Sequence, residues 1–249
     1  PAMRVLFILD GLFMGGAERN TLALMRALRP LGVEPSLCTL TAERDSALAE
    51  QLTGVAVHHN LEVGRLYDPR GWLRFLSLLR RQRYDCIHIE DPDGAPFGLI
   101  ARLLTGIPVV TTRHVLVDPS RGAWGKVRTR MLAAIAARGA DRFVLVAEAL
   151  RQNFRQQFGV GDDRISVIHN GVVLAADRRA ERPGLRARLG WPAGKPVLLM
   201  VAVFRPGKGH ELLLEALPSI LAKVPDLTVR FAGDGPERAR IEQLAAPFG

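Results

Sequence analysis

The stretch Val5-Leu6-Phe7-Ile8-Leu9-Asp10-Gly11-Leu12-Phe13-Met14-Gly15-Gly16-Ala17 decides the fold of this chain. Its first five residues are all apolar, which is typical of a strand buried on both faces of a parallel sheet. A glycine-rich turn follows, and we expect a helix from Ala17, in which Leu24, Leu28 and Leu31 share one face. Such a turn presents backbone N–H groups and the positive end of a helix at the carboxyl edge of a sheet, where an anion can bind. The alternative is a plain tight turn, because the G-x-G-x-x-G spacing is absent.

Strand and helix patterns alternate along the rest of the chain. Continuous apolar runs predict further strands at residues 86–89, 109–111, 143–146, 165–168, 197–201 and 227–231. Amphipathic patterns predict helices at residues 71–83, 123–138 and 211–223. In the second of these helices Val127, Met131 and Ile135 recur at a spacing of four and form the expected apolar face. This alternation predicts right-handed βαβ units and a doubly wound α/β fold.

A turn signal divides the alternation into two domains. His169-Asn170-Gly171 follows the run at 165–168, and residues 172–182 have no strong period. We therefore expect a complete first domain at residues 1–170. The second, at residues 171–249, has only two clear strands, roughly half of a sheet of ordinary size.

Composition excludes several classes of protein. The 249 residues are 48% hydrophobic, which rules out a disordered chain. The longest apolar run, at residues 197–204, is far shorter than the roughly 20 residues of a membrane span. Two cysteines, Cys38 and Cys86, lie in expected strands, so we interpret them as buried thiols in a reducing cytoplasm.

Basic residues concentrate in two segments, and the formal net charge is +9. Residues 119–158 carry eight basic side chains against two acidic ones, and residues 70–83 carry five arginines and no acid. These segments suit anionic lipid or a phosphorylated substrate, and a merely solvated face is the alternative. Nucleic acid is disfavoured, because no nucleic-acid motif is present and aromatic residues make up only 6%. The candidate face for a membrane or an acceptor comprises Arg121, Lys126, Arg128 and Arg130.

Two further segments carry candidate chemistry. His114 follows the strand at 109–111, so it is expected at the carboxyl edge of the sheet, where it could contact a substrate hydroxyl or exchange a proton. A surface-loop histidine is the alternative. The acids of the segment Glu90-Asp91-Pro92-Asp93-Gly94 could orient a sugar or a loop, but Asp-Pro and Asp-Gly are ordinary turn sequences, and we favour a turn. His88 is expected to be a satisfied core residue. Adjacent His58 and His59 lack the neighbours of a metal site.

The segment Arg205-Pro206-Gly207-Lys208-Gly209 is the most specific in the chain. It joins a buried strand to the helix expected at 211–223. Two cations, a flexible backbone and a helix N-terminus therefore converge on one point, an arrangement that holds a diphosphate without a metal. It is not a Walker A loop, because no Ser or Thr follows Lys208.

Taken together, five segments resemble the GT-B retaining glycosyltransferases of family four, the glycosyl transferases group one. They are Gly-Gly-Ala-Glu-Arg at 15–19, the strand ending in His114, Ile-His-Asn-Gly-Val at 168–172, Pro-Gly-Lys-Gly at 206–209 and Ala-Gly-Asp-Gly-Pro-Glu at 232–237. The resemblance covers essentially the whole chain. It implies a GT-B fold of two Rossmann-like domains, an acceptor-side domain followed by a nucleotide-sugar-binding domain of which this chain holds the first part.

The resemblance also implies an activity and its residues. The enzyme would move a sugar from a nucleotide-diphosphate donor to a glycan or lipid-linked acceptor in bacterial envelope synthesis, without metal or cofactor, in the cytoplasm or on the inner face of the plasma membrane. Gly15 and Gly16 would lie near the donor's phosphate and sugar. His114 would contact the transferred sugar. Lys208 would contact the diphosphate, with Arg205 and Gly209 beside it.

The sequence departs from the family pattern at three places. The residue before Asn170, commonly a proline, is His169. The position five residues before Lys208, usually an arginine, is Val203, so Arg205 is the candidate replacement. The family's paired glutamates would lie beyond Gly249, so we expect an incomplete second domain and poor transfer by this chain. The alternative function is a non-catalytic binding module derived from the same fold, or an inactive fragment. An NAD-type enzyme is disfavoured because the dinucleotide fingerprint is missing.

Overall fold

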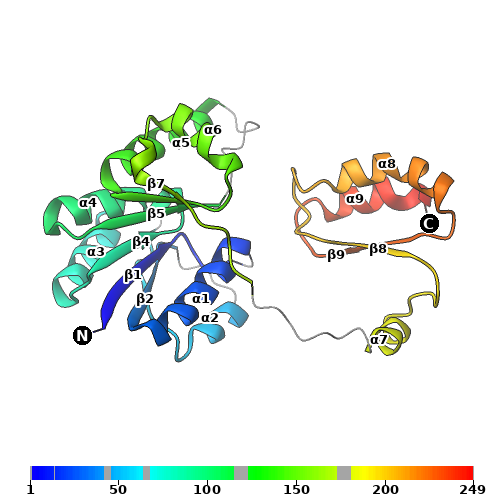
Figure 1. The fold of residues 1–249 in the computed structure, drawn as a ribbon, viewed down its shortest axis with the longest axis horizontal. Helices are drawn as coiled ribbons and strands as arrows, with labels where there is room; N and C mark the ends of the chain where they lie inside the picture. The colour runs from blue at the N-terminus through cyan, green and yellow to red at the C-terminus, as the bar shows by residue number, and fades with distance from the viewer. Residues whose placement is uncertain are drawn as a thin grey trace. The chain divides into compact units, whose positions relative to one another are not determined.

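A computed structural model describes residues 2–13, 15–41, 46–63, 68–114, 123–172 and 181–248. Its internal contacts divide the chain into two units, Pro1–Val172 and Val173–Gly249. The sequence places the boundary near residue 170. Each unit is an α/β structure, as the alternation of patterns predicts, and each is described by itself (Figure 1).

A seven-stranded parallel sheet forms the centre of the first unit. Its strands are β1 (Met3–Leu9), β2 (Val33–Thr39), β3 (Val57–Asn60), β4 (Cys86–Ile89), β5 (Val109–Arg113), β6 (Arg142–Leu145) and β7 (Ile165–Val167). They lie in the order β3-β2-β1-β4-β5-β6-β7. The direction of winding reverses between β1 and β4, which makes the crevice beyond their carboxyl ends the expected ligand site of such a sheet.

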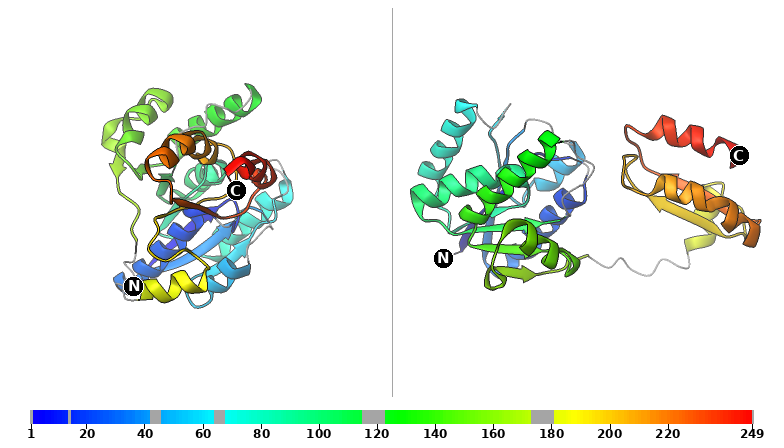
Figure 2. Two further views of the ribbon diagram at one scale, coloured as in Figure 1. Left: turned by 90° about the vertical axis from the view of Figure 1, so that its right-hand side faces the viewer. Right: turned by 90° about the horizontal axis from the view of Figure 1, so that it is seen from above.

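Helices cover both faces of this sheet (Figures 1 and 2). They are α1 (Gly16–Leu28), α2 (Ser46–Leu52), α3 (Pro69–Arg81), α4 (Ala95–Thr105), α5 (Ala123–Gly139) and α6 (Ala149–Phe158). Successive residues of β1 point to opposite faces: Phe7 and Leu9 pack with α1 and α2, whereas Leu6 and Ile8 pack with α3 and α4. All four side chains are fully buried, and each contributes roughly 1.5–3 kcal/mol through burial. Cys38 and Cys86 are buried free thiols, as expected.

Local sequence sets where the helices begin and end. Asp68 caps α3, because its side chain accepts a hydrogen bond of 2.9 Å from the backbone N–H of Arg70, and Pro69 suits the first helical turn. α1 ends at Leu28, and a single 3-10 turn (Arg29–Leu31) follows. Leu31 is therefore 77% exposed and does not share the buried face predicted for it.

The apolar face predicted for α5 is wrong. Val127 and Met131 are 57% and 51% exposed, whereas the side of α5 that packs inward carries Leu132, Ala133 and Ala136. Small residues decide this orientation, because they let α5 approach α4 closely. A Cβ atom on Gly139 would lie 2.8 Å from the Cα of Leu99. The helix thus leaves its larger apolar side chains exposed.

β2 and β3 are not among the continuous apolar runs, although a strand was expected around Cys38. Glu34, Pro35 and Ser36 interrupt the apolar pattern of β2, and β3 lies at the edge of the sheet with no buried residue. β2 therefore forms a strand mainly because it pairs with β1, and its own apolar pattern contributes less.

The second unit is smaller. Its elements are α7 (Arg182–Arg188), β8 (Val197–Val201), α8 (His210–Lys223), β9 (Thr228–Ala232) and α9 (Arg238–Ala245). β8 and β9 are parallel and are the two strands that the sequence predicts. α8 and α9 cover the same face of the two strands (Figure 1), where Phe204, Leu214, Leu217 and Ile241 form the core. Val201 is 74% exposed.

The loops after β8 and β9 hold each other by backbone contacts. The N–H of Phe204 donates to the carbonyl of Asp234 at 2.9 Å, and the N–H of Glu237 donates to the carbonyl of Phe204 at 3.0 Å. Gly233 allows this approach: its φ is +155°, and a Cβ atom there would lie 2.0 Å from the carbonyl oxygen of Ala202. The position of the basic loop at 205–209 therefore depends on a glycine in the other loop.

We predict that Gly233→Ala destabilises the second unit by roughly 2 kcal/mol or more, because neither backbone can yield without losing these hydrogen bonds. Hydrogen exchange of the β8 amides across a urea series measures it. Gly184→Ala in α7 is the matched control: no atom lies within 4 Å of its Cβ position, so the change should be neutral or stabilising by up to about 1 kcal/mol. Equal effects of the two substitutions would contradict the assignment.

Candidate functional site

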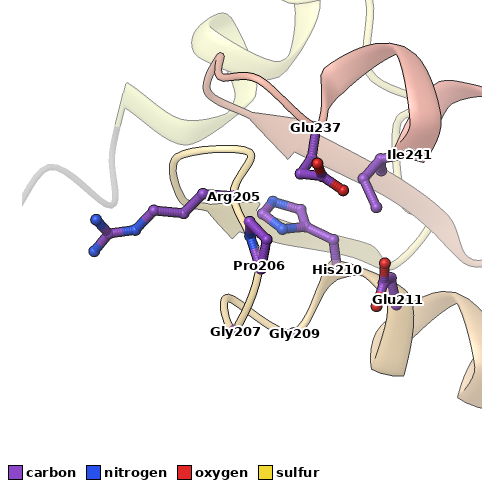
Figure 3. A pocket seen from close by; sticks show the side chains of 8 residues that line it. All are labelled: Arg205, Pro206, Gly207, Gly209, His210, Glu211, Glu237 and Ile241. Carbon is purple, nitrogen blue, oxygen red and sulfur yellow. The ribbon is translucent and has the colours of Figure 1, made fainter. Parts of the chain in front are cut away.

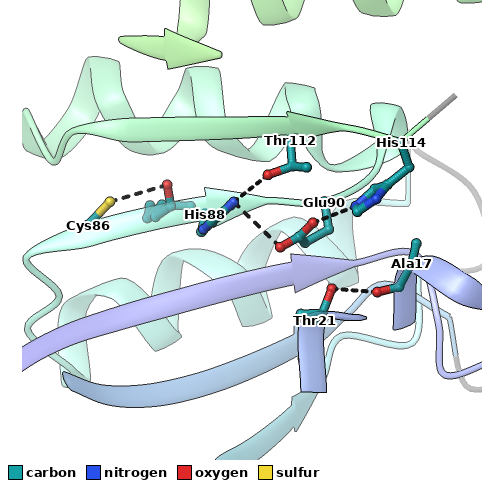
Figure 4. A network of polar contacts seen from close by, with 8 residues as sticks. Ala17, Thr21, Cys86, His88, Glu90, Thr112 and His114 are labelled. Carbon is teal, nitrogen blue, oxygen red and sulfur yellow. Dashed lines mark hydrogen bonds and ion pairs between the residues drawn. The ribbon is translucent and has the colours of Figure 1, made fainter. Parts of the chain in front are cut away.

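Four polar side chains gather at the carboxyl ends of β4 and β5 (Figure 4). His114 directly follows β5, and its Nε2 lies 2.8 Å from Oε2 of Glu90, which directly follows β4. The other carboxylate oxygen of Glu90 lies 3.5 Å from Nε2 of His88. That nitrogen is also 2.7 Å from Oγ1 of Thr112. The network thus joins two neighbouring strands.

This network is buried. The side chain of Glu90 has no exposed surface, and those of His114 and His88 are 12% and 15% exposed. Burial lowers the pKa of His88; the neighbouring Glu90 raises that pKa and His114 lowers it further. His88 is the satisfied strand residue that the sequence predicts. The surface-loop alternative for His114 does not hold, and Glu90 takes part in more than turn chemistry. Only Pro92–Gly94 form the expected turn, a single 3-10 turn.

A second carboxylate lies at the point where the winding of the sheet reverses. Asp91 Oδ2 accepts a hydrogen bond of 2.8 Å from the backbone N–H of Asp10, so it joins the end of β4 to the end of β1. The pKa of Asp91 is raised to about 6, chiefly by burial and also by the nearby charges of Asp10, Glu18 and Asp93, although the backbone hydrogen bond lowers it. The crevice therefore contains a carboxyl group that is partly protonated near neutral pH.

The glycine-rich turn leads into α1 as predicted, but the carboxylate of Glu18 covers this turn. Gly15 is the N-cap of α1, with extended backbone, and Gly16 is exposed. A Cβ atom on Gly15 would lie 2.2 Å from Oε2 of Glu18, so the Glu18 side chain folds back over the turn. A carboxylate in the first turn interacts favourably with the helix dipole. An anionic ligand at Gly15 would have to displace it.

In the second unit, the loop at 205–209 leads from β8 into α8 (Figure 3). Gly207 and Gly209 have φ values of +80° and +86°, and Gly209 is the N-cap of α8. Arg205 and Lys208 are exposed, and neither forms an ion pair with any residue that the structure describes. Because α8 has 14 residues, its N-terminal N–H groups and dipole add to these two cations.

A small pocket at this loop is lined by Arg205, Pro206, Gly207, Gly209, His210, Glu211, Glu237 and Ile241 (Figure 3). His210 is 3% exposed, and its ring stacks on that of Phe204 with 4.6 Å between centroids. Glu211 and Glu237 both form ion pairs with Arg240, the second at 3.1 Å. Arg240 thus partly offsets the negative charge at the pocket.

The predicted site residues fall into three places. Gly15, Gly16 and His114 lie at the carboxyl edge of the first unit's sheet. Arg205, Lys208 and Gly209 lie in one loop of the second unit. Of the candidate basic face, Lys126, Arg128 and Arg130 are exposed on α5, and Arg121 lies outside the described residues.

Two buried polar residues were not predicted for the site. Glu90 follows His88 at a spacing of two, so both side chains lie on the same face of β4, and this spacing is a signal that the sequence does contain. His210 gives no such signal, because its burial depends on Phe204 and Phe231 from other segments.

Comparison with known proteins decides the family. The sequence profile described as Glycosyltransferase Family 4 matches residues 14–176, well over half of the chain, and that described as Glycosyl transferases group 1 matches residues 181–249. The chain belongs to glycosyltransferase family 4.

Curated relatives of this family 4 chain include two actinobacterial enzymes. It is 30% identical to the D-inositol 3-phosphate glycosyltransferase of Thermobispora bispora, over 94% of this chain and 61% of the relative. It is 26% identical to the phosphatidyl-myo-inositol mannosyltransferase of Mycolicibacterium smegmatis, over 92% of this chain and 58% of the relative. The chain thus spans about three fifths of the length of these relatives.

Solved structures share the GT-B fold with this family 4 chain. The Anabaena protein HepE, solved in complex with UDP and glucose, superposes with a TM-score of 0.80 at 22% identity, covering 99% of this chain and 66% of HepE. A glycosyltransferase from Rickettsia africae superposes with a TM-score of 0.72 at 20% identity, covering 99% of this chain and 65% of the Rickettsia chain.

Within the described residues, no helix combines the length and apolarity needed to cross a membrane.

The raised pKa of Asp91 predicts a pH-dependent stability. Folded Asp91 titrates at about 6 and the unfolded group at 3.8, so the folded state binds the proton more tightly and loses stability as pH rises between these values. An asparagine side chain at this position would keep an oxygen acceptor for the Asp10 N–H without the charge. Asp91→Asn should therefore stabilise the first unit by roughly 2–3 kcal/mol at pH 8 and by only about 1 kcal/mol at pH 4.5.

Urea unfolding at both pH values measures this difference. Glu34→Gln, at an exposed carboxylate in β2 whose nearest cation is Arg4 at 3.9 Å, is the control and should show little dependence on pH. A gain from Asp91→Asn that is equal at both pH values would contradict the electrostatic explanation.

Proposed function

We propose that this chain forms the acceptor-side domain and the first part of the donor domain of an enzyme that transfers a sugar from a nucleotide-diphosphate donor to a glycan or lipid-linked acceptor. The transfer would retain the configuration of the sugar and need no metal. In the reaction, the bond between C1 of the sugar and the diphosphate oxygen breaks. The acceptor hydroxyl forms the new bond to C1, and its proton passes to the released nucleoside diphosphate or to solvent.

The single observation that carries this proposal is the loop at 205–209. Two cations without an ion-pair partner among the described residues, two left-handed glycines and a helix N-terminus converge there, and charge develops on the leaving diphosphate during transfer. Lys208 and the N-terminus of α8 would stabilise that charge, as a metal does in other enzymes. The crystal structures of HepE with UDP and with UDP-glucose support a nucleotide sugar as the donor.

The remaining predicted residues fit roles around this donor. Arg205 would replace the arginine that the family pattern places at Val203, because its side chain is exposed beside the loop. Gly15 and Gly16 would approach the phosphate and sugar once Glu18 moves aside. His114 would contact the transferred sugar.

We predict that Lys208→Ala weakens the binding of UDP but not of uridine. A charge-assisted contact to phosphate contributes roughly 1.5–3 kcal/mol, so UDP affinity should fall about tenfold or more. Isothermal titration with both ligands tests this. Lys223→Ala, at the opposite end of α8, removes the same charge and should leave both affinities unchanged. Equal losses for UDP and uridine would show that Lys208 does not contact phosphate.

Sugar transfer itself requires a direct assay with nucleotide sugars and phosphorylated or lipid-linked acceptors. Nucleotide binding without any turnover, by a chain extended to the length of the relatives, would favour the alternative, a binding module derived from the same fold. Lack of UDP binding by the unsubstituted protein would contradict the proposal.

We further propose that α5 contacts an anionic membrane surface where a lipid-linked acceptor lies. Trp124 is 87% exposed, and Val127 and Met131 follow it at helical spacing on the outward side of the helix. Lys126 and Arg130 are exposed on the same helix. Arg128 differs, because its guanidinium pairs with Asp93 at 2.5 Å. Apolar side chains flanked by cations are typical of helices that lie at the membrane interface.

We predict that reversing both charges, Lys126→Glu with Arg130→Glu, weakens binding to phosphatidylglycerol vesicles by at least about tenfold at low salt. Each basic residue near such a surface contributes about 1 kcal/mol, and salt screens that contribution. Vesicle co-sedimentation measures it. Arg182→Glu with Arg188→Glu, on α7 of the second unit and outside both basic segments, makes the same charge change and should have a smaller effect. Binding that depends on neither lipid charge nor salt would leave α5 as a solvated face.

A further inference from the structure

We propose that Glu90 is a positioning residue that holds His114 in the tautomer protonated at Nε2 and so presents Nδ1 as a hydrogen-bond acceptor. One part of the proposal rests on the proposed function: the donor of the hydrogen bond that Nδ1 of His114 would accept is a hydroxyl of the bound sugar. The tautomer itself follows from the contacts within the first unit.

The first step concerns what a buried carboxylate can accept. Glu90 lies between two imidazole rings, with Oε2 2.8 Å from His114 Nε2 and Oε1 3.5 Å from His88 Nε2. Its side chain has no exposed surface, and Oε1 has no hydrogen bond within the described part of the chain. A carboxylate oxygen that accepts a hydrogen bond offers a lone pair, so the ring nitrogen 2.8 Å from Oε2 must carry the hydrogen. Nε2 of His114 is therefore a donor, and Nε2 of His88 faces Oε1 without a hydrogen bond to it.

The second step concerns His88, the other ring that faces Glu90. Its ring stacks on Phe7 with 5.0 Å between centroids, and its Nε2 lies near both Thr112 Oγ1 and Glu90 Oε1. The opposite tautomer would point the Nε2 lone pair at the carboxylate. Burial lowers the pKa of His88, so this ring is neutral at neutral pH and brings an N–H dipole but no charge to the pair.

The third step concerns the atom of His114 that remains. With Nε2 committed to Glu90, the other ring nitrogen has no hydrogen bond to any described residue, and the side chain is only 12% exposed. An imidazole held in the tautomer protonated at Nε2 accepts a hydrogen bond at Nδ1 and cannot donate one there. By holding the hydrogen on Nε2, Glu90 thus makes Nδ1 of His114 a hydrogen-bond acceptor.

Glutamine at position 90 would be a different partner. Its amide has one oxygen that accepts and one NH₂ that donates, so it would turn an N–H group toward one of the two Nε2 atoms that Glu90 faces. We therefore expect Glu90→Gln to shift that histidine to the tautomer protonated at Nδ1, in which its Nε2 can accept. The side chains are nearly equal in size, so this variant separates hydrogen-bond polarity from packing.

The experiment is ¹⁵N NMR of the protein labelled at its six histidines. His114→Gln and His88→Gln each remove one set of signals and so assign the two rings. Near neutral pH we expect a protonated Nε2 and an unprotonated Nδ1 in both rings. An unprotonated Nε2, or a protonated Nδ1, in His114 would overturn the proposal.

The variants provide the second measurement. Glu90→Gln should move at least one of the two rings to the other tautomer. Asp93→Asn, the matched loss of a carboxylate three residues along the same segment, should leave both rings unchanged. Unchanged tautomers in Glu90→Gln would overturn the proposal. Because no donor or acceptor is added, these results do not depend on transferase activity. Failure of Lys208→Ala to discriminate UDP from uridine would count against the proposed function alone.

Discussion

The parallel pairing of β1 with β4 is the constraint on which the rest of the first unit depends. The sheet is wound in opposite directions from this pair, so helices leave both strands toward opposite faces and a crevice remains beyond their carboxyl ends. Asp10, Glu90 and Asp91 all lie at this edge. Glu90 is buried there, and Asp10 and Asp91 are partly buried.

A buried carboxylate at such an edge is stable when donors face it or when it keeps its proton. A buried ionised group without hydrogen bonds would cost several kcal/mol, and the two carboxylates meet this requirement differently. Glu90 faces two imidazole nitrogens. Asp91 has one backbone N–H and several like charges, and its pKa rises accordingly. The same edge of the sheet thus contains Glu90, which faces imidazole nitrogens, and Asp91, whose raised pKa lets it keep its proton to a higher pH.

In the second unit, a small core holds an exposed basic loop in place. Phe204 connects the two, because its ring stacks on that of His210 and its backbone forms hydrogen bonds with the loop after β9. Cations can then remain exposed on a loop whose backbone is fixed. For a site that binds an anion, this arrangement limits the entropy that ligand binding must remove.

The sequence by itself determines the features that depend on neighbouring residues. Apolar runs and helical periodicity predict most strands of the doubly wound fold, the position of His114 at the end of β5, and the basic loop before α8. Only the tertiary structure decides three others. α5 turns Val127 and Met131 outward because Gly139 permits close contact with α4, and β2 forms by pairing with β1. Glu90 and His114 meet because parallel strands 24 residues apart end at one edge, a contact between distant residues that no local pattern specifies.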